Sequence, residues 1–148
     1  MQHSNFEFVR HYHPELFTQL SHAEQLLGGD ASCFLLKLRL SLELWSHDFA
    51  DLRGIKLDKE LTLADKLQLL SSHVHFPECY LAQLSALRQL CNQGLHLQRD
   101  ARGRHVIQDS LSRSQQLNAL SCIYNLVLFN VRYVKPDSDR KSTRLNSS

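Results

Sequence analysis

The sequence has little of what interrupts helices. Its 148 residues include only 5 Gly and 3 Pro, and leucine is by far the commonest apolar residue, which favours a helical chain. No apolar run approaches the roughly 18 residues of a membrane-spanning helix. The first residues, MQHSNFEF, lack the basic start and apolar middle of a signal peptide. These absences predict one cytoplasmic domain that does not enter a membrane.

The sequence also lacks a large excess of either sign of charge. The 17 Lys and Arg residues against 15 Asp and Glu residues give a formal net charge of only +2, too small to indicate nucleic-acid binding by itself. The 4 Cys residues are scattered through mostly apolar helical segments, which favours reduced core thiols over a disulfide framework. The sequence shows no glycine-rich phosphate loop, nucleophile elbow or recognisable catalytic carboxylate pair. We therefore expect a domain that is not an enzyme and that needs no cofactor.

Apolar residues at three- and four-residue spacing predict helices. We expect them at residues 14–27, 31–53, 62–71, 78–96 and 112–135. The second carries an unbroken ladder of expected core positions: Leu35, Leu38, Leu42, Trp45, Phe49 and Leu52. A second line, Leu36, Leu40 and Leu44, predicts that this helix is central and covered on two sides. Short connections between five such helices predict an all-α, antiparallel bundle.

Several polar residues are placed to begin these helices. Asp30 is expected to cap the central helix, and Ser112 with Gln115 forms a capping box for the last one. Lys135-Pro136 is expected to end that last helix. From Asp139 the chain reads DRKSTRLNSS, which resembles the translation of a sequencing-adapter read-through. We therefore expect residues 1–138 to form one domain, the N-terminal part of a longer protein, and residues 139–148 to be a disordered artefact.

The segment LSALRQLCNQGLH, residues 84–96, places a cation on an apolar helix face. Arg88 falls within the stripe of apolar residues, and Asn92 and His96 follow it at i+4 and i+8. An arginine in a core is rare unless it is paired. The expected partner is Glu43 of the central helix. These residues define a predicted polar core cluster, made of Arg39, Glu43, Arg88, Asn92 and His96.

A functional interpretation of the same cluster stays open. Arg88 would grip a phosphate group and His96 would transfer a proton, as in a ribonuclease site. In the structural interpretation, Arg88 pairs with Glu43 while Asn92 and His96 brace the following loop.

Two other groups of residues suggest ligands. One group is made of His73, His75 and Cys79, and a separate one of His11 and His13. Neither supplies four ligands at the regular spacing of a structural zinc site, so we predict linker histidines and no metal.

The arginines around Gly103 are the other group. Arg99, Arg102 and Arg104 lie in an expected exposed turn or hairpin-like excursion, and they are candidates for contact with a nucleic-acid backbone.

Three blocks, SNFEFVRHYHPEL, CFLLKLRLSLEL and LRQLCNQGLH, carry a resemblance to a known family. In this order and spacing they resemble the small helical domain of unknown function that opens many type I restriction enzyme R subunits and related helicases. The matching positions are Asn5, Phe6, Phe8, Lys37, Arg39, Glu43, Arg88, Asn92 and His96. That family is in turn similar to HEPN-like bundles, some of which are metal-independent ribonucleases.

The resemblance implies a HEPN-like fold and an accessory role in restriction-modification or a helicase-associated process, a bacterial-type defence. We expect a non-catalytic docking domain whose partners are downstream domains of the same polypeptide or another protein, together with DNA or RNA. One alternative is a HEPN-like ribonuclease that uses Arg88 and His96 across a homodimer interface. Another is a stand-alone protein-interaction bundle without a nucleic-acid role.

Overall fold

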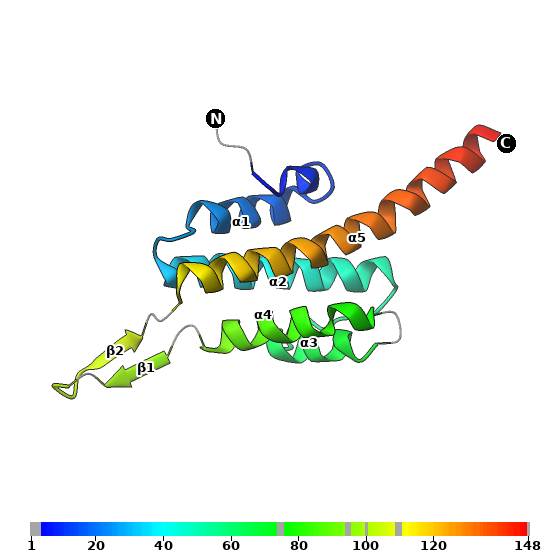
Figure 1. Cartoon of the computed structure of the whole chain (residues 1–148). Helices are drawn as coiled ribbons and strands as arrows, with labels where there is room; N and C mark the ends of the chain where they lie inside the picture. Colours follow the sequence, from blue (N-terminus) through cyan, green and yellow to red (C-terminus); the bar gives the residue numbers. More distant parts are fainter. Residues whose placement is uncertain (1–3, 74–75, 94–95, 100, 109–110, 148) are drawn as a thin grey trace.

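A computed structural model gives the fold. The structure describes residues 4–73, 76–93, 96–99, 101–108 and 111–147, with the backbone alone at 92, 93, 96–98, 105–108 and 134–147. The elements in chain order are η1 (Glu7–Val9), α1 (Pro14–Gln25), α2 (Ala31–Leu52), α3 (Leu63–Ser71), η2 (Glu78–Tyr80), α4 (Leu81–Gln93), β1 (His96–Arg99), β2 (His105–Gln108) and α5 (Arg113–Ser147). The predicted all-α bundle is confirmed, with a small hairpin added to it (Figure 1).

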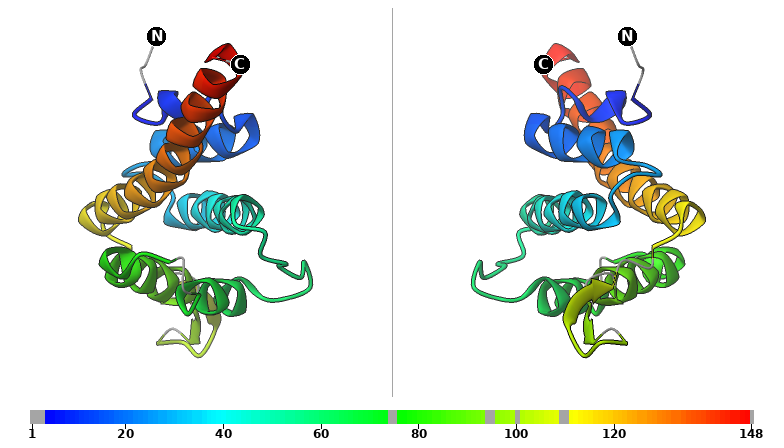
Figure 2. Two further views of the ribbon diagram at one scale, coloured as in Figure 1. Left: turned by 90° about the vertical axis from the view of Figure 1, so that its right-hand side faces the viewer. Right: turned by 90° about the vertical axis from the view of Figure 1, so that its left-hand side faces the viewer.

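Helix α2 is central, as its ladder predicts. Figure 2 shows α1 and α5 on one side of α2, and α3 and α4 on the other. Five of the six predicted ladder residues are fully buried: Leu35, Leu38, Leu42, Trp45 and Phe49. The sixth, Leu52 at the end of the helix, is only half-buried. The indole Nε1 of Trp45 also donates to the backbone carbonyl of Leu126 in α5 at 2.9 Å. This bond ties α2 to α5 at the middle of the core.

The helices are not all antiparallel to their chain neighbours. Glu43 of α2 meets Lys66 of α3, and Arg39 shares a pocket with Thr62 at the start of α3, so α2 and α3 run in the same direction. The segment of residues 53–62 between them is long enough to return the chain along the bundle. As a result, the first turn of α3 lies beside the middle of α2.

The predicted helix caps form. The side chain of Asp30 accepts from the backbone N–H groups of Ser32 at 2.9 Å and Cys33 at 3.4 Å. Ser112 and Gln115 make both bonds of the capping box, at 2.9 and 3.2 Å. These local signals position the starts of α2 and α5 correctly because a cap depends only on residues within one turn.

Two expectations about the helices are wrong. Leu36 and Leu40 are 53% and 39% exposed, so these two residues of the second apolar line face outward, whereas Leu44 is partly buried against the core. Helix α5 continues through Pro136 to Ser147, whereas the sequence predicts an end at Lys135-Pro136 and a disordered segment after it. Proline removes one backbone donor, but its φ value is compatible with a helix, so a helix can pass through it.

The segment after α4 also differs from the prediction. α4 ends at Gln93, and His96 begins β1 instead of extending the helix. β1 pairs antiparallel with β2 in the register His96–Gln108, Leu97–Ile107, Gln98–Val106 and Arg99–His105. This confirms the hairpin-like excursion, which projects from one end of the bundle (Figure 1). No helix within the described residues combines the length and the apolar character needed to cross a membrane.

Replacing Trp45 by Phe tests the link between α2 and α5. Trp45→Phe removes the 2.9 Å hydrogen bond to Leu126 and leaves unfilled volume, so the free energy of unfolding should fall by about 2 kcal/mol in chemical denaturation. The control Leu36→Ala lies on the exposed side of the same helix and should cost less than about 0.5 kcal/mol. Equal losses would show that the exposed face of α2 is also packed.

Candidate functional site

The predicted ion pair between Glu43 and Arg88 does not form. Glu43 Oε2 instead accepts from Lys66 Nζ at 2.7 Å, and His47 Nε2 lies 4.0 Å from the same oxygen. The Lys66 side chain is only 4% exposed, so it needs an anion more than the half-buried Arg88 does. Glu43 therefore pairs with the buried ammonium of Lys66 and not with Arg88.

Arg88 lies in the groove between α3 and α4. It lines two hollows there, one of about 200 Å³ on the side of Ser71 and Leu81 and one of about 100 Å³ on the side of Thr62 and Cys91. Among the described Asp and Glu residues, none makes an ion pair with Arg88. The guanidinium group thus lies between two helices without an acidic counter-charge from the described part of the chain.

Arg39 reaches the second of these hollows from α2. Its Nη1 donates to the backbone carbonyl of Cys91 at 3.2 Å, near the end of α4. Arg39 and Glu43 lie four residues apart on α2, but they form no ion pair among the salt bridges of the described residues. Burial raises the pKa of the Cys91 thiol to about 11, although the nearby charge of Arg39 lowers it. We call this hollow, which contains both guanidinium residues, the Arg39–Arg88 pocket.

The other two members of the predicted cluster are not assigned to this pocket. The side chains of Asn92 and His96 lie outside the described part of the structure. His96 belongs to β1, so the helical spacing that placed it on the face of Arg88 does not apply. Of the predicted cluster, the structure brings Arg39 and Arg88 together and gives Glu43 to Lys66.

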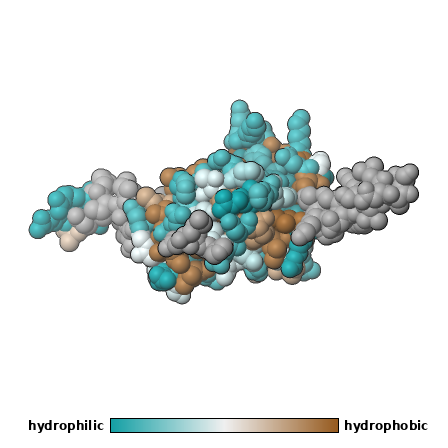
Figure 3. Space-filling view, turned by 90° about the horizontal axis from the view of Figure 1, so that it is seen from above, coloured by the Kyte–Doolittle hydropathy of each residue, from teal (hydrophilic) through white to brown (hydrophobic). Residues whose placement is uncertain are grey.

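The predicted basic loop forms the tip of the hairpin. Arg99, Arg102 and Arg104 are all exposed, and Arg99 Nη1 donates to the carbonyl of Gly103 at 3.0 Å. Gly103 has a φ of 78°, a left-handed conformation that suits glycine in a tight turn. The space-filling view shows hydrophilic residues at the end of this projection (Figure 3).

The histidine clusters give no metal centre in the described part of the chain. A search of those residues finds no group of three or more His, Cys, Asp and Glu side chains that could hold an ion. His13 instead caps α1, where its Nδ1 accepts from the N–H of Leu16 at 3.2 Å. His75 lies outside the described residues.

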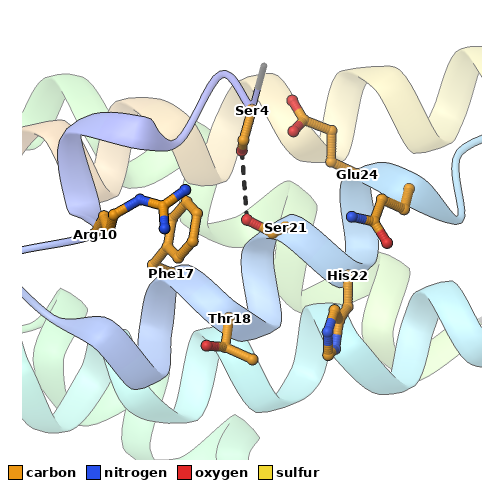
Figure 4. Close-up of a pocket in the computed structure, with 8 residues that line it drawn as sticks. Ser4, Arg10, Phe17, Thr18, Ser21, His22 and Glu24 are labelled. Carbon is orange, nitrogen blue, oxygen red and sulfur yellow. Dashed lines mark hydrogen bonds between the residues drawn. The ribbon is translucent and has the colours of Figure 1, made fainter. Parts of the chain in front are cut away.

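A larger pocket of about 450 Å³ lies beside α1. Arg10 points toward the ring of Phe17 there, 4.5 Å from its centroid, and Ser4 and Ser21 lie 3.5 Å apart on their hydroxyl oxygens (Figure 4). Arg10 also forms a 2.7 Å ion pair with Glu7, which raises the pKa of the guanidinium through that hydrogen bond. The cation of this pocket is therefore already neutralised.

A partly buried polar network that the sequence analysis missed joins three segments. Asp48 of α2 accepts from Tyr12 Oη at 2.5 Å and from Asn130 Nδ2 of α5 at 3.0 Å, on the same oxygen. Burial raises the pKa of Asp48, while the hydrogen bonds from Tyr12 and Asn130 lower it in part. The pKa of Tyr12 is raised by burial and by its bond to Asp48. The network ties the N-terminal segment to α2 and α5.

Arg53, at the end of α2, packs within aromatic rings beside this network. Its guanidinium carbon lies 3.6, 5.0 and 4.3 Å from the ring centroids of Phe49, Phe129 and Tyr133. Nη1 donates to the carbonyl of Phe49 at 3.1 Å, and burial lowers the pKa of the group. These contacts make Arg53 part of the core packing at this end of the bundle.

Sequence signals for the missed residues did exist. Lys66 lies three residues after Leu63 and four before Leu70, so it falls on the apolar face of its helix. Asn130 follows Val127 by three residues on the apolar stripe of the last helix. The three- and four-residue spacing that identified Arg88 as a polar residue on an apolar helix face identifies Lys66 and Asn130 in the same way.

Comparison of the chain with protein-family models, curated proteins and solved structures finds no match. The geometry of the pockets and of the hairpin is therefore the basis for assigning a function.

A double-mutant cycle tests the pair of Lys66 and Glu43. Glu43→Gln leaves a buried ammonium without its counter-charge, so the free energy of unfolding should fall by about 2 kcal/mol in urea denaturation. Lys66→Met should cost less than about 1 kcal/mol because the apolar chain fills similar space. Adding Glu43→Gln to Lys66→Met should then cost little more. As a control, Glu60→Gln on an exposed loop should change stability by less than about 0.5 kcal/mol.

The half-buried carboxyl of Asp48 predicts a pH dependence. Because its pKa is raised on folding, the stability linked to its proton is fully present below the ordinary carboxyl pKa and is lost as pH rises through the raised value. Asp48→Asn keeps an oxygen that accepts from Tyr12 and Asn130 but cannot titrate. The free energy of unfolding of the natural chain minus that of Asp48→Asn should therefore increase as pH falls from neutral toward about 4. If the difference in free energy of unfolding stayed constant across that range, the raised pKa of Asp48 would be contradicted.

Proposed function

We propose that this chain is a non-catalytic helical docking domain that contacts the phosphate backbone of nucleic acid through the tip of its hairpin. The observation that carries the proposal is the clustering of exposed Arg99, Arg102 and Arg104 on one projecting turn. Guanidinium groups form charge-assisted hydrogen bonds with phosphate, and a two-stranded ribbon is narrow enough to follow a groove. The hairpin is thus suited to a backbone contact.

The expected contact is electrostatic and independent of sequence. Arg99 already uses one nitrogen to hold the turn through Gly103, which fixes the backbone that carries the other two arginines. Contacts to phosphates position a protein on a strand without reading its bases. The bundle would supply the rigid body that joins this contact to other domains or proteins.

The resemblance of three sequence blocks to the N-terminal helical domain of type I restriction R subunits and related helicases supports the same role. In that setting a small helical domain would dock beside a motor or nuclease and add affinity for DNA or RNA. Helix α2 offers an outward face for docking, since Leu36 and Leu40 on it are exposed. The polar hairpin tip and the apolar face would then have separate partners.

The test removes three charges from the hairpin and compares salt dependence. In the triple variant Arg99→Gln, Arg102→Gln and Arg104→Gln, affinity for duplex DNA should fall. The slope of log K against log salt should drop by about 0.9 for each phosphate that the variant no longer neutralises. Fluorescence anisotropy across a salt series measures both quantities. The charge-preserving Arg→Lys triple should retain most of the binding.

A matched control removes three charges from other surfaces. Lys56→Gln, Lys59→Gln and Arg132→Gln lie at exposed positions outside the hairpin and should leave the slope nearly unchanged. An equal loss in this control, or no binding to DNA or RNA even at low salt, would refute the proposal. In the second case the interpretation as a stand-alone protein-interaction bundle would be favoured. Metal-independent RNA cleavage that His96→Ala abolishes would favour the ribonuclease.

A further inference from the structure

We infer that the Arg39–Arg88 pocket binds a phosphate group. Two guanidinium side chains, from α2 and α4, line one hollow of about 100 Å³. Neither is paired with an Asp or Glu of the described residues. Two arginines in one pocket repel each other unless an anion lies between them. The pocket therefore has the charge of an oxyanion site without a protein anion to fill it.

The acid nearest in sequence to Arg39 is committed elsewhere. Glu43, one helical turn after Arg39, is held by Lys66 at 2.7 Å. Asp65 lies in the first turn of α3, exposed to solvent, and it is not among the residues that line the pocket. Among the described residues that line the pocket, the charged ones are therefore the two arginines.

One hydrogen bond orients the exposed side chain of Arg39 in the absence of a ligand. Its Nη1 donates to the carbonyl of Cys91 at 3.2 Å, which holds the guanidinium at the end of α4 and leaves its other N–H groups for an anion. Arg88 is half buried between α3 and α4, which restricts its side chain on the side of the two helices. Such preorganisation reduces the entropy lost on binding.

The remaining wall of the pocket favours the same ligand. Thr62, Leu63 and Ala64 line it, and they are the N-cap and first residues of α3. The first backbone N–H groups of a helix lack intrahelical partners, and the helix dipole attracts negative charge there. The start of α3 therefore adds to the attraction for an anion, but the inference of a phosphate site depends on the two arginines.

The size of the pocket limits the ligand to a small group. A hollow of about 100 Å³ can take a tetrahedral phosphate but not a nucleobase beside it. The phosphate could belong to a free ion or nucleotide, or to the end or backbone of a strand. This inference does not depend on the hairpin.

The experiment follows amide signals of the full chain by NMR during titration with inorganic phosphate at constant ionic strength. Signals of the backbone amides of Leu63 and Ala64, and of the Nε–H groups of Arg39 and Arg88, should shift at millimolar phosphate. Arg39→Gln and Arg88→Gln should each weaken the affinity about tenfold or more, since each removes charge-assisted hydrogen bonds. The matched control Arg132→Gln, an exposed arginine of α5, should leave the affinity unchanged.

A second variant addresses folding. Arg88→Lys keeps the charge but loses the forked geometry, so it should fold and bind phosphate more weakly than the natural chain. The absence of shifts at Leu63, Ala64 and both arginines, or the same affinity in Arg39→Gln as in Arg132→Gln, would overturn the inference. The hairpin triple variant should bind inorganic phosphate normally, so failure of the hairpin proposal is distinguished from failure of this one.

Oligonucleotides identify the source of the phosphate. Stronger binding of a 5′-phosphorylated strand than of its 5′-hydroxyl form, abolished by Arg39→Gln, would assign the pocket to a terminal phosphate. Equal binding of the two forms, weakened by Arg39→Gln, would assign it to the strand backbone. An effect of Arg39→Gln on inorganic phosphate or nucleoside monophosphate alone would assign it to a free phosphate compound. Each of these outcomes supports a phosphate site, and insensitivity of all three ligands to Arg39→Gln refutes it.

Discussion

The structure depends on covering α2 on two sides. Its ladder of large apolar side chains, with Trp45 at the centre, is fully buried from Leu35 to Phe49, and no single neighbouring helix can cover so wide a surface. The indole hydrogen bond to Leu126 adds direction to this packing, because it fixes which turn of α5 crosses α2. The positions of α1, α3 and α4 follow from the faces that remain. The hairpin and the Arg39–Arg88 pocket lie at the edges of this arrangement.

Competition for Glu43 shows how the packing decides the electrostatics. Lys66 of α3 and Arg88 of α4 lie on neighbouring helices, and among the described residues only Lys66 forms an ion pair with Glu43 through its ammonium group. The ammonium of Lys66 is almost completely buried and lies 2.7 Å from Glu43, whereas Arg88 keeps access to solvent. An unpaired buried charge costs several kcal/mol, roughly, while a partly hydrated guanidinium tolerates the lack of a partner. The fold therefore neutralises the lysine and leaves positive charge in the groove between α3 and α4.

Local features were predictable from the sequence, and the choice of partners was not. The caps at Asp30 and Ser112 depend on one helical turn, and the ladder of α2 depends on one helix. By contrast, the parallel course of α2 and α3 is set by the long segment between them, and only this course brings Lys66 beside Glu43. The same limit applies to the end of α4. Apolar periodicity through His96 suggested a longer helix, but the pairing of His96 with Gln108 across the hairpin takes precedence.

The two proposed phosphate contacts would differ in physical character. A net charge of +2 gives the whole molecule little long-range attraction for a polyanion, so binding depends on where the cations are concentrated. Exposed arginines on the hairpin act through solvent and are screened strongly by salt. Arg39 is itself exposed and Arg88 is half buried, but the two residues line one hollow from different helices. The hairpin is thus suited to capturing a strand along its backbone, and the pocket to holding one phosphate between two helices.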